Sequence, residues 1–157
     1  MFRNIIRTSD DKVLTLLRLA LAIVVFPHGA QKVLGWFGGF GFAGTYGFLT
    51  QQMHIPAALA LLVFAAEFLA PIGLFFGLLG RVAAFGIAVD FIVALFKVHL
   101  PNGFFMNWSG QQKGEGIEFF ILAIGIALAI MIGGSGGWSI DRLLTGKDQL
   151  QRNKTSA

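Results

Sequence analysis

Four long apolar runs, separated by polar or glycine-rich segments, organise this chain. They cover roughly residues 13–34, 56–79, 82–100 and 117–133. A helix that crosses a bilayer needs about 20 mostly apolar residues, so the first three runs are long enough to span a membrane. The fourth run is shorter and has to draw flanking glycines into the interfacial zone. The pattern predicts an all-α fold class, an integral membrane antiparallel four-helix bundle with aromatic and glycine-rich outer loops.

Composition supports the membrane class. Of 157 residues, 55% are hydrophobic and 13% are charged, and the mean hydropathy is +0.73. A soluble core this apolar would leave too little polar surface to cover itself. The chain contains no cysteine, which excludes disulfides, thiolate metal sites and a dithiol relay within this subunit. We interpret residues 1–157 as a single membrane domain.

Positive charge is distributed unevenly around the apolar runs. Of the 12 Lys and Arg residues, nine flank the ends that face the chain termini, whereas Lys32, Lys97 and Lys113 belong to the other side. By the positive-inside rule we expect both tails, residues 1–12 and 142–157, to lie in the cytoplasm. The basic residues are dispersed rather than clustered on a soluble face, so they indicate topology and no nucleic-acid partner.

Polar side chains interrupt the end of the first run, in the stretch Phe26–Lys32. Pro27 has no N–H, so within a helix it frees a carbonyl group and favours a kink. His28 and Lys32 are four residues apart and therefore share one helical face. These two side chains either reach for the membrane interface or form one wall of a polar pocket.

Charged residues also occur near the middle of the predicted spans. Glu67 and Asp90 lie at mid-depth in the second and third runs, and Arg18 lies a turn or two into the first. Each falls on the stripe of small residues along its helix, so these faces are expected to point into the bundle. Because an unpaired charge at this depth is costly, we predict an intramembrane charge pair of Arg18 with Glu67 or Asp90. That pair either locks the bundle or takes part in proton transfer.

A second polar layer is predicted nearer the outer face. Besides Lys97 and Glu115, it contains the candidate ligand-binding residues His28, Lys32, Glu118 and His99. Two histidines and a glutamate could bind zinc, but two lysines in the same layer oppose a cation, so no metal site is predicted. Haem b between the two histidines is disfavoured because His99 lies about half a turn out of phase with Asp90, although Pro101 could end the helix early and re-aim the ring.

A quinone-type ring fits this outer layer better. Histidine and lysine can donate hydrogen bonds to a quinone oxygen, a glutamate can exchange a proton with it, and aromatic loop residues can flank the ring. The aromatic residues of the two outer loops, 35–55 and 101–116, would also suit a plain interfacial belt. From the residues alone we assign no resident cofactor and no catalytic residue, and we assign no role to His54.

Several motifs together resemble the DoxX family of small four-helix membrane proteins, over about residues 13–144. The motifs are Arg18-Leu19-Ala20-Leu21, His28-Gly29-Ala30-Gln31-Lys32 with Gly35, Glu67, Gly80-Arg81, Val98-His99-Leu100-Pro101-Asn102-Gly103-Phe104-Phe105, Gly116-Ile117-Glu118 and Ser139-Ile140-Asp141. The resemblance implies a protein of the cell inner membrane, and relatives are associated with sulfur oxidation at the quinone pool and with redox-stress complexes. It does not imply one reaction, and the lack of cysteine argues against a direct thiol relay.

The sequence therefore predicts an accessory or electron-transfer subunit of a membrane redox system with a quinone-type ligand. Whether the chain is itself an enzyme stays open. Two other classes also stay open, a small-solute or lipid transporter and a membrane scaffold for a soluble oxidoreductase. In the scaffold class the partner would dock on the basic cytoplasmic residues 142–154. A homo-oligomer is compatible with each of these readings.

Overall fold

The structure, a computed structural model, describes residues 2–146, and every regular element in that range is helical. Three segments are long and apolar enough, by length and composition, to cross a membrane: Lys12–Leu34, Ala57–Phe76 and Gly80–Asn102. A fourth apolar helix, Glu118–Gly133, has 16 residues. The predicted all-α class and the membrane character are confirmed.

The second and third long segments combine α-helical with π-helical turns, whereas α2 (Lys12–Leu34) is α-helical throughout and continues through Pro27. The second segment consists of α4 (Ala57–Phe64), the π-helix η3 (Ala65–Leu69) and α5 (Ala70–Phe76). The third consists of α6 (Gly80–Ala94), the π-helix η4 (Leu95–His99) and the 3-10 turn η5 (Leu100–Asn102). The remaining elements are α1 (Phe2–Ile6), the 3-10 turn η1 (Trp36–Gly38), α3 (Gly41–Gly47), the π-helix η2 (Phe48–Gln52) and α7 (Glu118–Gly133).

Local signals set the ends of the long helices. The Asp11 carboxylate caps α2 by accepting hydrogen bonds from the N–H groups of Val13 and Leu14 at 2.7 and 3.2 Å, which satisfies donors that the helix itself leaves unpaired. Gly35 ends α2 in the left-handed conformation, with φ of 73°. Gly77 does the same for α5, with φ of 65°, so this helix ends slightly before its predicted boundary.

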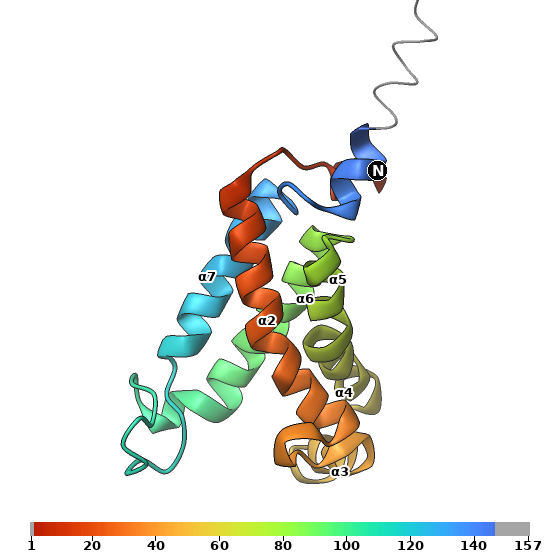
Figure 1. Cartoon of the computed structure of the whole chain (residues 1–157). Helices are drawn as coiled ribbons and strands as arrows, with labels where there is room; N and C mark the ends of the chain where they lie inside the picture. Colours follow the sequence, from red (N-terminus) through yellow and green to blue (C-terminus); the bar gives the residue numbers. More distant parts are fainter. Residues whose placement is uncertain (1, 147–157) are drawn as a thin grey trace, which may run out of the picture.

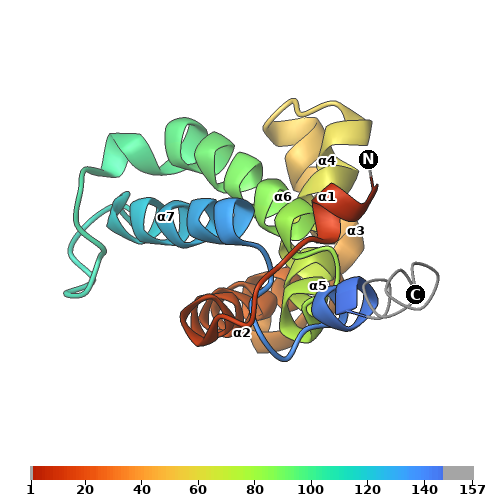
Figure 2. The ribbon, with the colours of Figure 1, turned by 90° about the horizontal axis from the view of Figure 1, so that it is seen from above.

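The three long segments and α7 pack in a ring of neighbours. Helix α2 lies against α5, η3 and α7, and α6 lies against α5 and α7. Viewed along the molecule from one end, α6 and α7 run side by side (Figure 2). The core between the helices consists mainly of small and branched side chains: Leu21, Ala22, Val25, Leu74, Ala84, Ile87, Ala88, Ala127 and Ile130. Large apolar side chains such as Leu16, Phe85 and Leu122 are exposed on the outer surface, as expected for helices that face lipid.

The two ends of the molecule differ in shape. At one end the helices converge beneath the N-terminal residues, whereas toward the other end α6 and α7 lean away from α2 and α4 (Figure 1). The connection that contains α3 and the connection between η5 and α7 both lie at this far end (Figure 1). Side chains of these diverging helices line a cavity.

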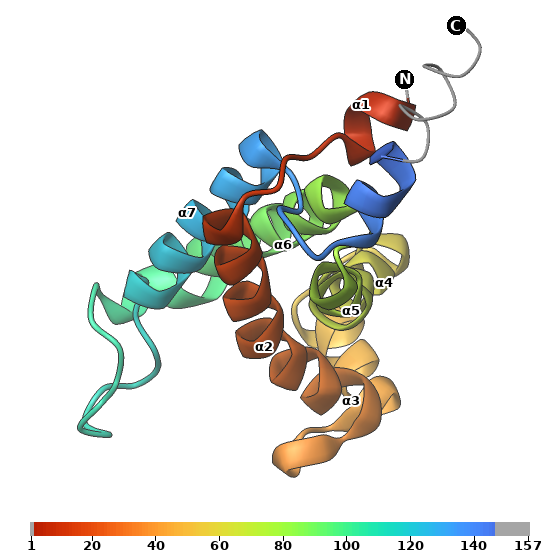
Figure 3. The same ribbon diagram turned by 45° about the horizontal axis from the view of Figure 1, so that its top comes forward.

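The described parts of both predicted tails pack together. The Thr145 hydroxyl donates a hydrogen bond to the Ile6 carbonyl oxygen at 3.3 Å, and Arg142 forms an ion pair with Asp10 at 2.7 Å. Figure 3 shows α1 beside the short helix formed by residues 140–146. Most of the predicted cytoplasmic tail 142–157 cannot be compared with the structure, because residues 147–157 lie outside the described range. The chain ends that are described therefore lie at the same end of the helices.

Candidate functional site

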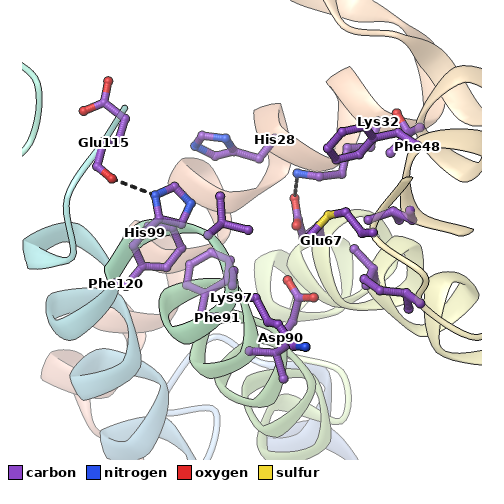
Figure 4. A pocket seen from close by; sticks show the side chains of 18 of the residues that line it. His28, Lys32, Phe48, Glu67, Asp90, Phe91, Lys97, His99, Glu115 and Phe120 are labelled. Carbon is purple, nitrogen blue, oxygen red and sulfur yellow. Dashed lines mark hydrogen bonds and ion pairs between the residues drawn. The ribbon is translucent and has the colours of Figure 1, made fainter. Parts of the chain in front are cut away.

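A cavity of about 380 Å³ lies between the diverging helices, at the end away from the chain termini. Its polar lining consists of His28, Lys32, Thr45, Glu67, Asp90, Lys97, His99 and Glu115. The remaining lining is apolar and includes the aromatic rings of Phe48, Phe91, Phe119 and Phe120. Figure 4 shows the charged and imidazole groups arranged around this space. The size and the mixed lining suit a small organic molecule.

An ion pair between Lys32 and Glu67 forms one wall of the cavity. The Lys32 ammonium group donates a hydrogen bond to the Glu67 carboxylate, and the two side chains are 30% and 8% exposed (Figure 4). Lys32 comes from the last turn of α2 and Glu67 from η3. Gly29 makes this approach feasible, since a Cβ atom at that position would overlap the carbonyl oxygen of Glu67. The small residue beside His28 therefore brings α2 against η3.

Three π-helical segments contribute to the cavity. Phe48 belongs to η2, Glu67 to η3, and Lys97 and His99 belong to η4. A π-helical turn contains about one residue more than an α-helical turn, so it rotates every later side chain by roughly 100° around the helix. This rotation explains why His99 lines the same cavity as Asp90, although straight α-helical phase places them half a turn apart. π-Helical turns often occur at functional sites.

The His99 ring is held in place by neighbours from the opposite segment. Its Nδ1 atom lies 2.9 Å from the carbonyl oxygen of Glu115, and its ring centroid lies 4.2 Å from that of Phe120. The Asn102 side-chain amide donates a hydrogen bond to the same Glu115 carbonyl at 3.1 Å. The ring is therefore clamped between a backbone carbonyl group and an aromatic face (Figure 4).

His28 and Asp90 complete the polar lining. The ring centroid of His28 lies 6.1 Å from that of Phe119. Asp90 Oδ2 is buried and accepts no hydrogen bond from a donor within residues 2–146, although the Asp90 carboxyl group lies within hydrogen-bonding reach of the Glu67 carboxyl group. A buried carboxylate oxygen without a partner is costly, so the protein groups around this cavity leave hydrogen-bonding capacity for a bound molecule.

Arg18 occupies a different place from the one that the sequence indicated. Instead of pairing with Glu67 or Asp90, its guanidinium donates hydrogen bonds to the carbonyl oxygens of Leu74, of Phe75 at 2.6 Å and of Trp138 at 3.1 Å. The first two carbonyls belong to the last turn of α5, where the Leu74 carbonyl also accepts the Gly77 N–H at 3.0 Å and the Phe75 carbonyl lacks a helical partner. The predicted charge pair with Arg18 is therefore corrected: Glu67 pairs with Lys32.

Glu118 is also placed differently. It begins α7, and its carboxylate accepts a hydrogen bond from the Trp108 indole N–H at 3.2 Å; it is not among the residues that line the cavity. Glu115 lines the cavity instead. The reason lies in the loop, whose backbone bonds to Gly103 and Phe104 draw the residues before α7 across the end of α6. Of the four predicted ligand-binding residues, the structure brings together His28, Lys32 and His99.

Asp90, Lys97 and Glu115 line the cavity, although the sequence analysis did not assign them to the ligand site. Asp90 and Lys97 lie seven residues apart on one predicted helical face, a signal that pointed to the site. Position along the chain placed Glu115 in the outer polar layer, but it lies in a loop without helical periodicity, so no sequence signal indicated that it lines the site. Within residues 2–146, no three His, Asp or Glu side chains cluster closely enough to hold a metal ion.

The helices and the cavity together define a helical membrane protein with a polar and aromatic site between its spans. The chain belongs to the DoxX family, whose model matches residues 13–100; this range includes the cavity residues from His28 to His99. A curated relative, "Putative oxidoreductase CatD" of Bacillus subtilis (strain 168), is 32% identical over 92 residues, which cover 59% of this chain and 63% of the relative. The match thus spans less than two thirds of that relative's length. No solved structure matches this chain.

Proposed function

We propose that this DoxX-family protein is an accessory or electron-transfer subunit of a membrane redox system, and that it binds a quinone-type ring in the cavity. The observation that carries the proposal is the Lys32–Glu67 ion pair set in a largely apolar, aromatic cavity of about 380 Å³. A quinone has the complementary chemistry, an apolar ring with oxygen acceptors at its edge. The printed name of the curated relative, which describes an oxidoreductase, supports the redox context.

The proposed binding mode assigns separate roles to the lining residues. The Lys32 ammonium group can donate a hydrogen bond to a ring oxygen while Glu67 holds it in position. The rings of Phe48, Phe91 and Phe119 offer apolar faces on which the ligand can pack. A hydrogen bond to a charged donor is strengthened where water is scarce, so a few such groups can orient a ligand whose surface is mostly apolar.

The proposed topology is an antiparallel four-helix bundle in the cell inner membrane, formed by α2, the α4–α5 segment, the segment Gly80–Asn102 and α7. Two observations support it: the described chain ends lie together at one end (Figure 3), and most Lys and Arg residues belong to that same side. Both termini are then cytoplasmic, and the cavity lies in the outer half of the membrane. A C-terminal tag accessible only from outside intact cells would contradict this orientation.

Ligand titration of the purified protein tests the proposed function. We expect decylubiquinone to bind saturably to the protein in mild detergent, measured by isothermal titration calorimetry against empty micelles. Lys32→Gln should weaken binding about tenfold or more, because a charged hydrogen bond is lost. Lys113→Gln removes a lysine that does not line the cavity and should bind normally, as should Glu118→Gln. Absence of saturable binding, or equal losses in all three variants, would overturn the proposal.

The other functional classes have distinct signatures. Uptake of a solute by proteoliposomes without an electron donor would favour a small-solute or lipid transporter. A soluble oxidoreductase that docks on residues 142–154, and self-association into a homo-oligomer, are proposals about partners; residues 147–154 lie outside the described range. Co-purification from cross-linked membranes, followed by mass spectrometry, would identify either kind of partner.

A further inference from the structure

The two nitrogen atoms of His99 have different surroundings. Nδ1 lies 2.9 Å from the Glu115 carbonyl oxygen, and the ring is among those that line the cavity. In Figure 4 the ring lies across the cavity from Lys32 and Glu67, and its side away from Glu115 faces the open space. One nitrogen is therefore engaged by the protein, and the other is available to a ligand.

The hydrogen bond to Glu115 determines which nitrogen carries the hydrogen. A carbonyl oxygen can only accept, so Nδ1 has to donate, and in the neutral ring the lone pair is then on Nε2. In water the opposite tautomer, with hydrogen on Nε2, is the more common one for histidine. The Glu115 carbonyl therefore selects a form of His99 that offers a hydrogen-bond acceptor to the cavity.

The loop that supplies this carbonyl is itself anchored on both sides. The Glu115 carboxylate accepts a hydrogen bond from the Asn107 N–H at 2.6 Å. The N–H of Ile117 donates to the Gly103 carbonyl at 3.2 Å. Together with the Phe120 ring, which lies against His99, these contacts keep the Glu115 carbonyl pointed at Nδ1. The acceptor on Nε2 is thus a property of the folded loop and not of the side chain alone.

We infer that the cavity selects the reduced, hydroxyl-bearing form of its ring ligand, with one ligand hydroxyl donating to His99 Nε2 and the far oxygen accepting from Lys32. The inference rests on the proposed function and adds a specificity-determining residue to it. A quinone oxygen can only accept, so at His99 it would meet a lone pair. A hydroquinone hydroxyl supplies the missing hydrogen, and its second oxygen still accepts from the ammonium group.

The affinities of the two ligand forms provide the first test. We expect decylubiquinol, titrated anaerobically, to bind about tenfold more tightly than decylubiquinone. This is the usual difference in affinity between a ligand that forms one hydrogen bond and a ligand that leaves the same acceptor unpaired. The dimethyl ether of the same quinol keeps the reduced ring and lacks both hydroxyl hydrogens, so it should bind no better than the quinone. Equal affinities for quinol and ether would overturn the inference while leaving quinone binding intact.

Variants at His99 provide the second test. His99→Phe keeps a ring against Phe120 and removes both nitrogens, so it should lower quinol affinity about tenfold and leave quinone affinity within about twofold. His54→Asn removes an imidazole that does not line the cavity and should preserve the preference. If His99→Phe weakened both ligand forms equally, the ring would serve packing and the inference would fail.

Nitrogen-15 NMR of histidine-labelled protein tests the tautomer without any ligand. The chain has three histidines, and the His99→Phe variant identifies the signals of His99. At a pH where the ring is neutral, Nδ1 should carry the hydrogen and Nε2 should resonate as the bare nitrogen. The reverse assignment would overturn the inference even if quinones bind. Failure of both ligand forms to bind would overturn the proposed function and the inference together.

Discussion

Two buried carboxyl groups, Asp141 at one end of the molecule and Asp90 at the other, have opposite surroundings. At the end that carries the chain termini, the Asp141 carboxylate accepts hydrogen bonds from the N–H groups of Leu79 and Gly80 at 2.8 and 3.0 Å and from the Ser135 hydroxyl at 2.6 Å. All of these partners belong to the protein itself. In the cavity at the other end, Asp90 Oδ2 is buried and has no partner within the described residues.

This difference separates structural from functional polar groups. A carboxylate whose acceptor sites are filled by backbone donors stabilises the fold and offers nothing to a ligand. Asp90 retains hydrogen-bonding capacity, and three other polar cavity residues, Glu67, Lys97 and His99, lie on π-helical turns. Such turns are less favourable than α-helical ones and need a compensating role. Charge inside a membrane protein therefore does not by itself identify a functional site, and neither does one unpaired polar atom, since Arg18 Nε at the closed end also has no hydrogen-bond partner within the described residues. At Asp90 the unpaired oxygen lies in a cavity lined by several other polar groups.

The largest expected effect is at the closed end. Asp141→Ala removes three hydrogen bonds and leaves two backbone N–H groups without a partner, so it should lower the free energy of unfolding by about 3 kcal/mol or more. Thermal unfolding in detergent measures the loss. Asp10→Ala, which breaks an exposed ion pair with Arg142, serves as control and should cost about 0.5 kcal/mol or less. Similar losses in both variants would contradict the comparison.

The second-largest effect on stability is expected at the Lys32–Glu67 ion pair of the cavity. Lys32→Met leaves the Glu67 carboxylate buried and unpaired, which should lower the free energy of unfolding by about 2–3 kcal/mol. In the double variant Lys32→Met/Glu67→Leu, much of that stability should return while ligand binding stays lost. Thermal unfolding and titration of the same samples separate the two quantities. A double variant that recovers binding would show that the pair serves packing alone.

A smaller effect is expected where α2 approaches η3. Gly29→Ala places a methyl group against the Glu67 carbonyl, so it should cost about 1–2 kcal/mol through displacement of η3. Gly125→Ala is the matched control, because a Cβ atom at that position of α7 meets no other atom within 4 Å. There the better helix propensity of alanine should leave stability unchanged or raise it slightly. Equal behaviour of the two variants would argue against the close approach.

The smallest effect concerns Arg18 and Asp90. In a double-mutant cycle with Arg18→Met and Asp90→Leu, we expect a coupling energy within about 0.5 kcal/mol, because the two side chains have no common partner in the structure. Arg18→Met alone should still be destabilising, since the Phe75 carbonyl loses its side-chain donor and the Leu74 carbonyl keeps only the Gly77 N–H. A coupling energy above about 1 kcal/mol would restore the pair that the sequence suggested.

The sequence was most informative about structural features that depend on one segment of the chain alone. Asp11 before an apolar run and Gly35 after it mark the ends of α2 through local contacts, Asp11 by its side-chain carboxylate and Gly35 by its left-handed backbone. The apolar length of each long segment indicates membrane character, because the cost of burying polar backbone in lipid leaves few alternatives to a helix. His28 and Lys32 were also recognisable, since residues four apart share a helical face.

The sequence by itself thus determined the class of protein, the long helices and one wall of the cavity. Only the tertiary structure decided that Arg18 caps α5, that Glu67 pairs with Lys32 and that Glu115 rather than Glu118 lines the cavity. The physical reason is that each of these choices depends on a partner far away in the chain. The turn η4, which brings His99 into the cavity, shifts the helical phase in a way that no residue pattern announces.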